Sequence, residues 1–284
     1  MALQDVSPQR GTYDLRATLI WMKQDVFLAA RRRGVRLGGA LGLAVCLGAC
    51  SVPQKDPAVG DEADVRRAAQ TLLLTPSGGG DWQTFQLPGK LFAPFRSVVR
   101  QGRPALQVHA HRSVSVLRRQ FQPGIAAVGT LDFSWKVDAL PEGADLKDAG
   151  ATDAPARILL AFEGDRSKWN ARTHRLSELS QLLTGEPLPY ATLSYVWSRD
   201  DPVDAVLPNP RTDRIRKVVV ESGEQNLGRW REYRRDVRAD FIRAFGEEPG
   251  PLVAVALMTD TDNTGSTLQA WYGALRLVDL SAGR

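Results

Sequence analysis

The chain has 284 residues, of which 43% are hydrophobic and 24% are charged, so it is long enough and apolar enough to bury a core. Its net charge of +5 comes from 37 basic and 32 acidic residues. Residues 1–49 contain seven of the basic residues and three of the acidic ones. The rest of the chain therefore carries 30 basic and 29 acidic residues. This balance gives no basic footprint for nucleic acid, and no such partner is expected.

The first 49 residues have the layout of a bacterial secretory leader. A basic stretch at 31–36 precedes an apolar run at 37–47, which is shorter than the ~20 residues of a membrane-spanning helix. The next residues, Leu47-Gly48-Ala49-Cys50, resemble a lipobox, in which the Cys50 sulfur takes diacylglycerol. The alternative is a conventional cleavage site with an incidental cysteine. Met22 is the expected start, because residues 1–21 match no part of a signal peptide.

These features predict a lipoprotein of the bacterial cell envelope that contacts the membrane through an N-terminal lipid anchor. Residues 50–80 form the expected tether, with a short helix at 64–74, and residues 81–284 form the expected folded domain. Ser51 stands where an Asp often retains lipoproteins at the inner membrane, so the outer membrane, facing the periplasm, is favoured. Cys46 falls in the leader and Cys50 would be acylated, which excludes cysteine catalysis in the mature domain.

From Trp82 onwards, apolar and polar residues alternate with the period of two that is typical of β-strands. The clearest alternation, at 131–137, predicts a half-buried strand, and residues 101–104 predict the turn of a hairpin. Further strands are expected at 156–163, 191–197, 215–221, 229–235, 252–259 and 270–278.

Two amphipathic helices are expected between these strands, at 167–183 and 236–245. The first would bury a face of leucines and the second a face with Val237 and Phe241. Strands and helices do not alternate, which excludes a doubly wound parallel sheet. The sequence therefore predicts a mainly β fold: an antiparallel β-sandwich of the jelly-roll type with one or two helical insertions.

Several blocks of the domain carry a resemblance to a known family. They are Phe133-Ser134-Trp135-Lys136-Val137, Leu193-Ser194-Tyr195-Val196-Trp197, Phe245-Gly246-Glu247-Glu248-Pro249 and the segment from Met258 to Gly265. Over roughly residues 80–280 they resemble the bacterial domain of unknown function 3047, which implies an exported protein with no assigned activity. Where that family often has an acidic residue after Tyr-Gly, this chain has Ala274. The layout is also similar to galactose-binding-like jelly rolls, the architecture of many carbohydrate-binding modules.

The segment Asp-Thr-Asp-Asn-Thr-Gly at 260–265 offers hard oxygen ligands of the kind that Ca²⁺ prefers. Asp260, Asp262 and Asn263 are the candidate ligands. An EF-hand is excluded, because its twelfth position would be Trp271 instead of Glu. The alternative is a polar turn in which Asp and Asn cap backbone amides. No other cofactor is expected.

Six residues on or beside the predicted strands are candidate contacts for a ligand. Aromatic rings can stack on sugar rings, and an arginine can hold an anionic group. The alternative is core packing for the aromatic residues and a solvated face for the arginine. The candidates are Tyr195, Trp197, Trp230, Arg234, Trp271 and Tyr272.

The leading functional hypothesis is a non-enzymatic binding module for carbohydrate or another small polar ligand. One alternative is an envelope hydrolase with a carboxylate pair, for which Glu163, Asp165, Glu232 and Asp236 are available. Another is a structural or interaction lipoprotein. The chain has no nucleophile elbow, zinc-protease motif or phosphate-binding loop, so the sequence identifies no catalytic residue.

Overall fold

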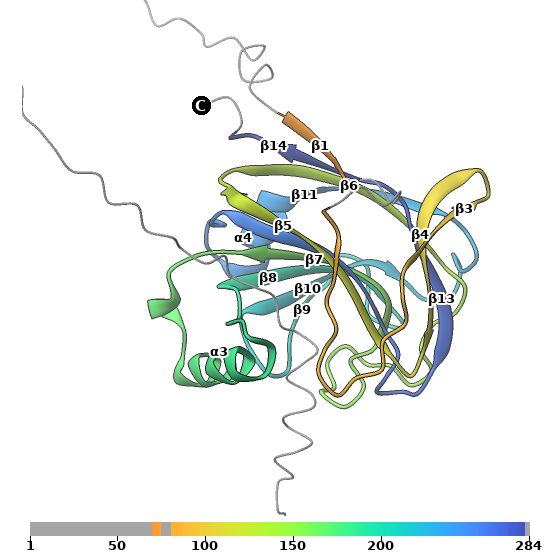
Figure 1. The fold of residues 1–284 in the computed structure, drawn as a ribbon, viewed down its shortest axis with the longest axis horizontal. Helices are drawn as coiled ribbons and strands as arrows, with labels where there is room; N and C mark the ends of the chain where they lie inside the picture. The colour runs from red at the N-terminus through yellow and green to blue at the C-terminus, as the bar shows by residue number, and fades with distance from the viewer. Residues whose placement is uncertain (1–69, 75–80, 282–284) are drawn as a thin grey trace, which may run out of the picture.

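Two β-sheets packed face to face form the body of the computed structural model, which describes residues 70–74 and 81–281 (Figure 1). The predicted leader, Cys50 and Met22 lie outside the described residues. Within the described residues, no helix is both long enough and apolar enough to cross a membrane. The predicted mainly β fold, a β-sandwich with one or two helical insertions, is confirmed, and two helices lie among the described residues.

The first sheet has seven strands, and every neighbouring pair is antiparallel. Six strands follow the order β1-β14-β6-β13-β4-β3, and β11 pairs with the remaining edge of β6. The strands are β1 (Gln70–Leu74), β3 (Arg96–Arg100), β4 (Arg103–His111), β6 (Val128–Val137), β11 (Arg231–Asp236), β13 (Thr267–Tyr272) and β14 (Leu275–Asp279).

The second sheet also has seven strands, in the order β2-β5-β12-β7-β8-β10-β9. Its pairs are antiparallel except for β8 and β10, which are parallel and so need a crossover between them instead of a hairpin. The strands are β2 (Gln83–Thr84), β5 (Val114–Ile125), β7 (Ala154–Phe162), β8 (Ala191–Ser198), β9 (Val206–Pro208), β10 (Ile215–Ser222) and β12 (Leu252–Asp260).

Apolar side chains from both sheets meet in the interior of the sandwich. The predicted alternation in β6 is confirmed, because Leu131, Phe133 and Trp135 are at most 3% exposed. Aromatic rings connect the sheets: the ring centres of Phe133 and Tyr195 are 5.7 Å apart, and those of Trp135 and Trp197 are 6.5 Å apart. Such pairs add packing energy to the large areas that the rings bury. Alternate side chains of β6 consequently point outward from the first sheet.

The helix α4 (Val237–Phe245) agrees with the prediction. Asp236 begins it by accepting a hydrogen bond from the Ala239 amide at 2.9 Å, as an N-cap residue does. Val237 and Phe241 are buried, as expected. The helix contacts β6 and β11 of the first sheet and β10 of the second, so it bridges the two sheets (Figure 1).

The helix α3 (Ala171–Thr184) buries a different face from the predicted one. It also begins later, because a separate 3₁₀ turn, η2 (Arg166–Lys168), precedes it. Leu182 of the predicted apolar face is 82% exposed. The buried side chains are the hydroxyls of Thr173, Ser177 and Ser180. Two of them bond to the following loop, because Ser180 donates to the Glu186 carbonyl and Ser177 accepts from the Leu188 amide. The helix therefore packs against polar backbone groups that need partners.

Two further segments differ from the prediction. Residues 70–74 were expected at the end of a helix in the tether, but they form β1, which pairs with β14. Residues 270–278 were expected as one strand, but Gly273 and Ala274 separate β13 from β14. The Gly273 amide donates to the Ser134 carbonyl of β6, and a β-carbon at this position would collide with the Ser134 hydroxyl. Glycine therefore allows this close approach to β6 while Ser134 keeps its hydroxyl in place.

Candidate functional site

The outer face of the first sheet carries three of the six predicted ligand contacts. They are Trp230, Arg234 and Trp271. The strand register places Arg234 of β11 opposite Asp132 of β6, and Asp132 opposite Arg276 of β14. Further along β6, Lys136 is opposite Trp271 of β13. Residues from three segments that are distant in the sequence thus share one surface.

A groove of about 510 Å³ opens on this face where β6 lies between β11 and β14. The Arg234 Nε lies 3.6 Å from the Asp132 Oδ1, and Glu232 forms an ion pair with Arg103. The Arg234 side chain is 71% exposed, so it can turn toward a ligand at little cost. The polar lining residues are Asp132, Ser134, Glu232, Arg234 and Arg276.

The two tryptophans of this face are covered by cations. Trp271 is only 2% exposed, because the Arg100 guanidinium lies 4.9 Å and the Lys136 ammonium 5.7 Å from its ring centre. Burial, together with the charge of Arg100, lowers the pKa of Lys136. Trp230 is half-buried, with the Arg103 guanidinium 5.7 Å from its ring centre. A ligand can reach the Trp271 ring only if Arg100 moves.

A second hollow, of about 560 Å³, lies beside β1 and β5. Its lining includes Leu72, Arg119 and Pro123 but none of the predicted ligand contacts. The groove between β11 and β14 is therefore the better candidate.

Tyr195, Trp197 and Tyr272 do not reach the surface, contrary to their predicted contact with a ligand. All three side chains are fully buried, because they occupy the inward positions of their strands. Their polar atoms bond within the core: the Tyr195 hydroxyl donates to Asp240 at 3.0 Å, and the Trp197 indole N–H donates to the Gly223 carbonyl at 3.0 Å. These rings stabilise the sandwich by packing.

The carboxylates considered for hydrolysis have structural partners. Glu163 accepts from Arg166 at 2.7 Å, Asp165 caps η2, and Asp236 caps α4. Of the four, only Glu232 lines the groove.

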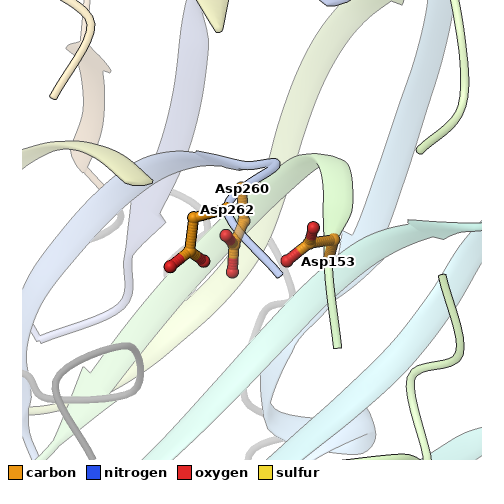
Figure 2. A group of neighbouring side chains, drawn as sticks. All are labelled: Asp153, Asp260 and Asp262. Carbon is orange, nitrogen blue, oxygen red and sulfur yellow. The ribbon is translucent and has the colours of Figure 1, made fainter. Parts of the chain in front are cut away.

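Three aspartates meet where the loop after β12 passes the start of β7 (Figure 2). Carboxylate oxygens of Asp153, Asp260 and Asp262 all lie within 4.8 Å of one another. Asp260 ends β12 and Asp262 follows in the loop, whereas Asp153 directly precedes β7. The structure thus brings together two of the predicted calcium ligands. Asn263, the third predicted ligand, contacts the cluster through its backbone N–H, which donates to Asp153 at 3.3 Å.

Sequence reasoning missed Asp153 and most of the groove. Asp153 reaches the cluster because β7 pairs with β12, and the sequence alone does not show this pairing. Its position just before a predicted strand was the only available signal. Asp132 and Arg276 are opposite each other through the pairing of β6 with β14, which is also invisible in the sequence.

Comparison with solved structures finds carbohydrate-binding modules. The family 11 module of a cellulosomal cellulase of Clostridium thermocellum is 8% identical, with a TM-score of 0.37, and the match covers 73% of this chain and 94% of that chain. A family 29 module from Piromyces equi is 7% identical, with a TM-score of 0.31, and the match covers 75% of this chain and 91% of that chain. A mutant family 29 module complexed with cellulohexaose is 11% identical, with a TM-score of 0.32, and the match covers 75% of this chain and 92% of that chain. Similarity this low says nothing about a shared ligand.

No curated protein matches the chain. A family model does match, over residues 80–276, and this range runs from just before β2 into β14. It therefore includes all the strands from β2 to β13, the first two residues of β14, both helices, the groove and the three aspartates. The match covers most of the chain, which belongs to the family described as Protein of unknown function (DUF3047).

Proposed function

We propose that the protein is a lipid-anchored component of the bacterial cell envelope whose β-sandwich binds a carbohydrate or a related small polar ligand. The observation that carries the binding proposal is the groove on the outer face of the first sheet, with its mixed acidic and basic lining. The anchor proposal rests on the lipobox-like sequence that ends at Cys50. An outer-membrane position facing the periplasm follows from Ser51 at the next residue.

The groove lining suits a ligand with many hydroxyl groups. A sugar hydroxyl both donates and accepts hydrogen bonds, so it can donate to Asp132 and Glu232 and accept from Arg234 and Arg276. Two acidic and two basic side chains balance each other, which favours a neutral polar ligand over a highly charged one. Trp271 lies on the same face and would offer a ring for stacking once Arg100 moves aside.

The binding proposal can be tested by applying the purified protein to a glycan array and measuring the dissociation constant of each positive glycan by calorimetry. We expect Arg234→Ala and Arg276→Ala each to weaken binding about tenfold or more, because a hydrogen bond from a charged donor contributes about 1.5–3 kcal/mol. Arg238→Ala is the matched control. This exposed arginine of α4 pairs with Glu248, does not line the groove, and its loss should leave binding unchanged.

Three results would contradict the proposal. The array could yield no glycan that binds in solution. The control substitution could weaken binding as much as the groove substitutions do, which would place the site elsewhere. Release of new reducing ends from a bound glycan would show a hydrolase instead of a binding module.

A further inference from the structure

Asp260 combines complete burial with a lack of hydrogen-bond donors. Its side chain is fully buried, and neither carboxylate oxygen has a hydrogen-bond partner among the described residues. A buried carboxylate ordinarily requires several donors or a bound cation, because transfer out of water is costly. Figure 2 shows the Asp260 carboxylate between those of Asp153 and Asp262. Its unmatched oxygens thus lie within the cluster.

The neighbouring cations only partly offset the three negative charges. Arg157 is the nearest cation to Asp260, but its Nη2 is 3.9 Å from the Asp260 Oδ2 and donates to the Thr152 carbonyl. Lys90 pairs with Asp262 at the outer side of the cluster. The cluster therefore needs either a proton or a further cation.

Asp153 is already fixed in place by the loop that carries Asp262. Its Oδ2 accepts from the backbone amide and the hydroxyl of Thr264, each at 2.8 Å, and its Oδ1 accepts from the Asn263 amide. These three bonds occupy three of the roughly four lone-pair sites of the carboxylate and leave one on Oδ1 for a further interaction. The three carboxylates are thus preorganised on two strand ends and one restrained loop.

From this geometry we infer that Asp153, Asp260 and Asp262 form a binding site for a calcium ion. Calcium binds oxygen ligands at about 2.3–2.6 Å, so two oxygens on one ion can be up to about 5 Å apart. The separations here, all within 4.8 Å, meet that condition. The three ligands are carboxylates, which suit a hard cation such as calcium better than zinc or copper, for which nitrogen and sulfur ligands are usual. The ion would connect β12, the loop at 261–266 and the start of β7.

The inference is independent of the groove and predicts a structural effect. An ion that binds only the folded chain stabilises it by mass action. At a calcium concentration a hundred times the dissociation constant, the melting temperature should rise by about 5–10 °C for a domain of this size. The experiment compares the purified full chain after EGTA treatment with the same sample in excess calcium, by calorimetry. Equilibrium dialysis should find one saturable calcium per chain.

Asp260→Asn separates the two explanations of the buried carboxyl. The amide mimics a protonated acid, so the variant should fold and should lose both the calcium-dependent shift and the bound calcium. Asp262→Asn changes a less buried carboxylate and should also lose the calcium-dependent shift and the bound calcium. It replaces Asp260→Asn in the test if Asp260→Asn does not fold. Asp148→Asn is the control, because Asp148 bonds to the Gly150 amide in an exposed loop and should leave the response intact.

A melting temperature that is the same in EGTA and in calcium would overturn the inference and assign the cluster a shared proton instead. So would an Asp260→Asn variant that keeps the full response. Failure of glycan binding would leave these readouts unaffected, so the two proposals can fail separately.

Discussion

Glu221, near the end of β10, shows how single charges are held inside this sandwich. Its carboxylate accepts hydrogen bonds from the Tyr233 hydroxyl at 2.7 Å, from Arg231 Nε at 2.9 Å and from the Asn226 amide at 3.2 Å. Burial alone would raise the pKa of Glu221. The donors outweigh burial, so the pKa lies below its ordinary value. The ionised form is therefore the one that stabilises the fold.

This shift predicts how the stability should depend on pH. Because the folded pKa is below the unfolded value of about 4.3, the stabilisation is complete above that value and is lost as the pH falls through the folded pKa. We expect Glu221→Gln to lower the free energy of unfolding by about 1–3 kcal/mol at pH 7. The difference from the wild type should shrink below about pH 4 in urea titrations.

The control is Glu224→Gln on the adjacent turn, where the side chain is 67% exposed and its nearest cation is 3.8 Å away. It should change stability by a few tenths of a kcal/mol at most, at any pH. The loss in free energy of unfolding caused by Glu221→Gln could instead stay constant down to pH 3. That result would contradict the prediction, because it would assign the stabilisation to the hydrogen bonds and not to the negative charge of Glu221.

At the scale of elements, the passage from β13 to β14 depends on one close contact. Gly273→Ala should lower the free energy of unfolding by about 1–3 kcal/mol, because the new methyl group collides with the Ser134 hydroxyl. Ser134→Ala alone should have little effect, and it should restore most of the stability when combined with Gly273→Ala. A double-mutant cycle by urea unfolding measures this coupling. Gly150→Ala is the control, since its nearest neighbour would be 3.5 Å away. If the two substitutions change the free energy of unfolding additively, the predicted collision between a methyl group at position 273 and the Ser134 hydroxyl is wrong.

Elements with a strong local pattern could be predicted from the sequence, and contacts between elements could not. The alternation in β6 and the capped, amphipathic α4 are properties of a few consecutive residues. The break at Gly273 depends on Ser134, and the buried face of α3 depends on polar groups of a later loop. The same limit applies to the sites: Asp260 and Asp262 are two residues apart in the sequence, whereas Asp153 joins them only through strand pairing.

At the scale of the whole molecule, the proposed lipid anchor would decide where the sandwich acts. If Cys50 is acylated, Cys50→Ser should abolish incorporation of labelled palmitate and leave the precursor unprocessed or the protein unlipidated. Cys46→Ser is a matched control, because this cysteine lies in the predicted leader and should leave labelling unchanged. A wild-type protein without label, or a labelled Cys50→Ser variant, would contradict the lipobox interpretation.

The position of β1 has a consequence for the solubility of the protein. β1 covers the edge of β14, pairing residue by residue from Gln70 to Leu74. Without it, β14 would present a row of unpaired N–H and C=O groups, beside Leu275 and Leu277, which are buried when β1 is present. An open edge of this kind is a template for pairing with another chain. A soluble form that starts at Asp81, the boundary suggested by the sequence, would therefore tend to self-associate, whereas one that starts before Gln70 keeps the edge closed.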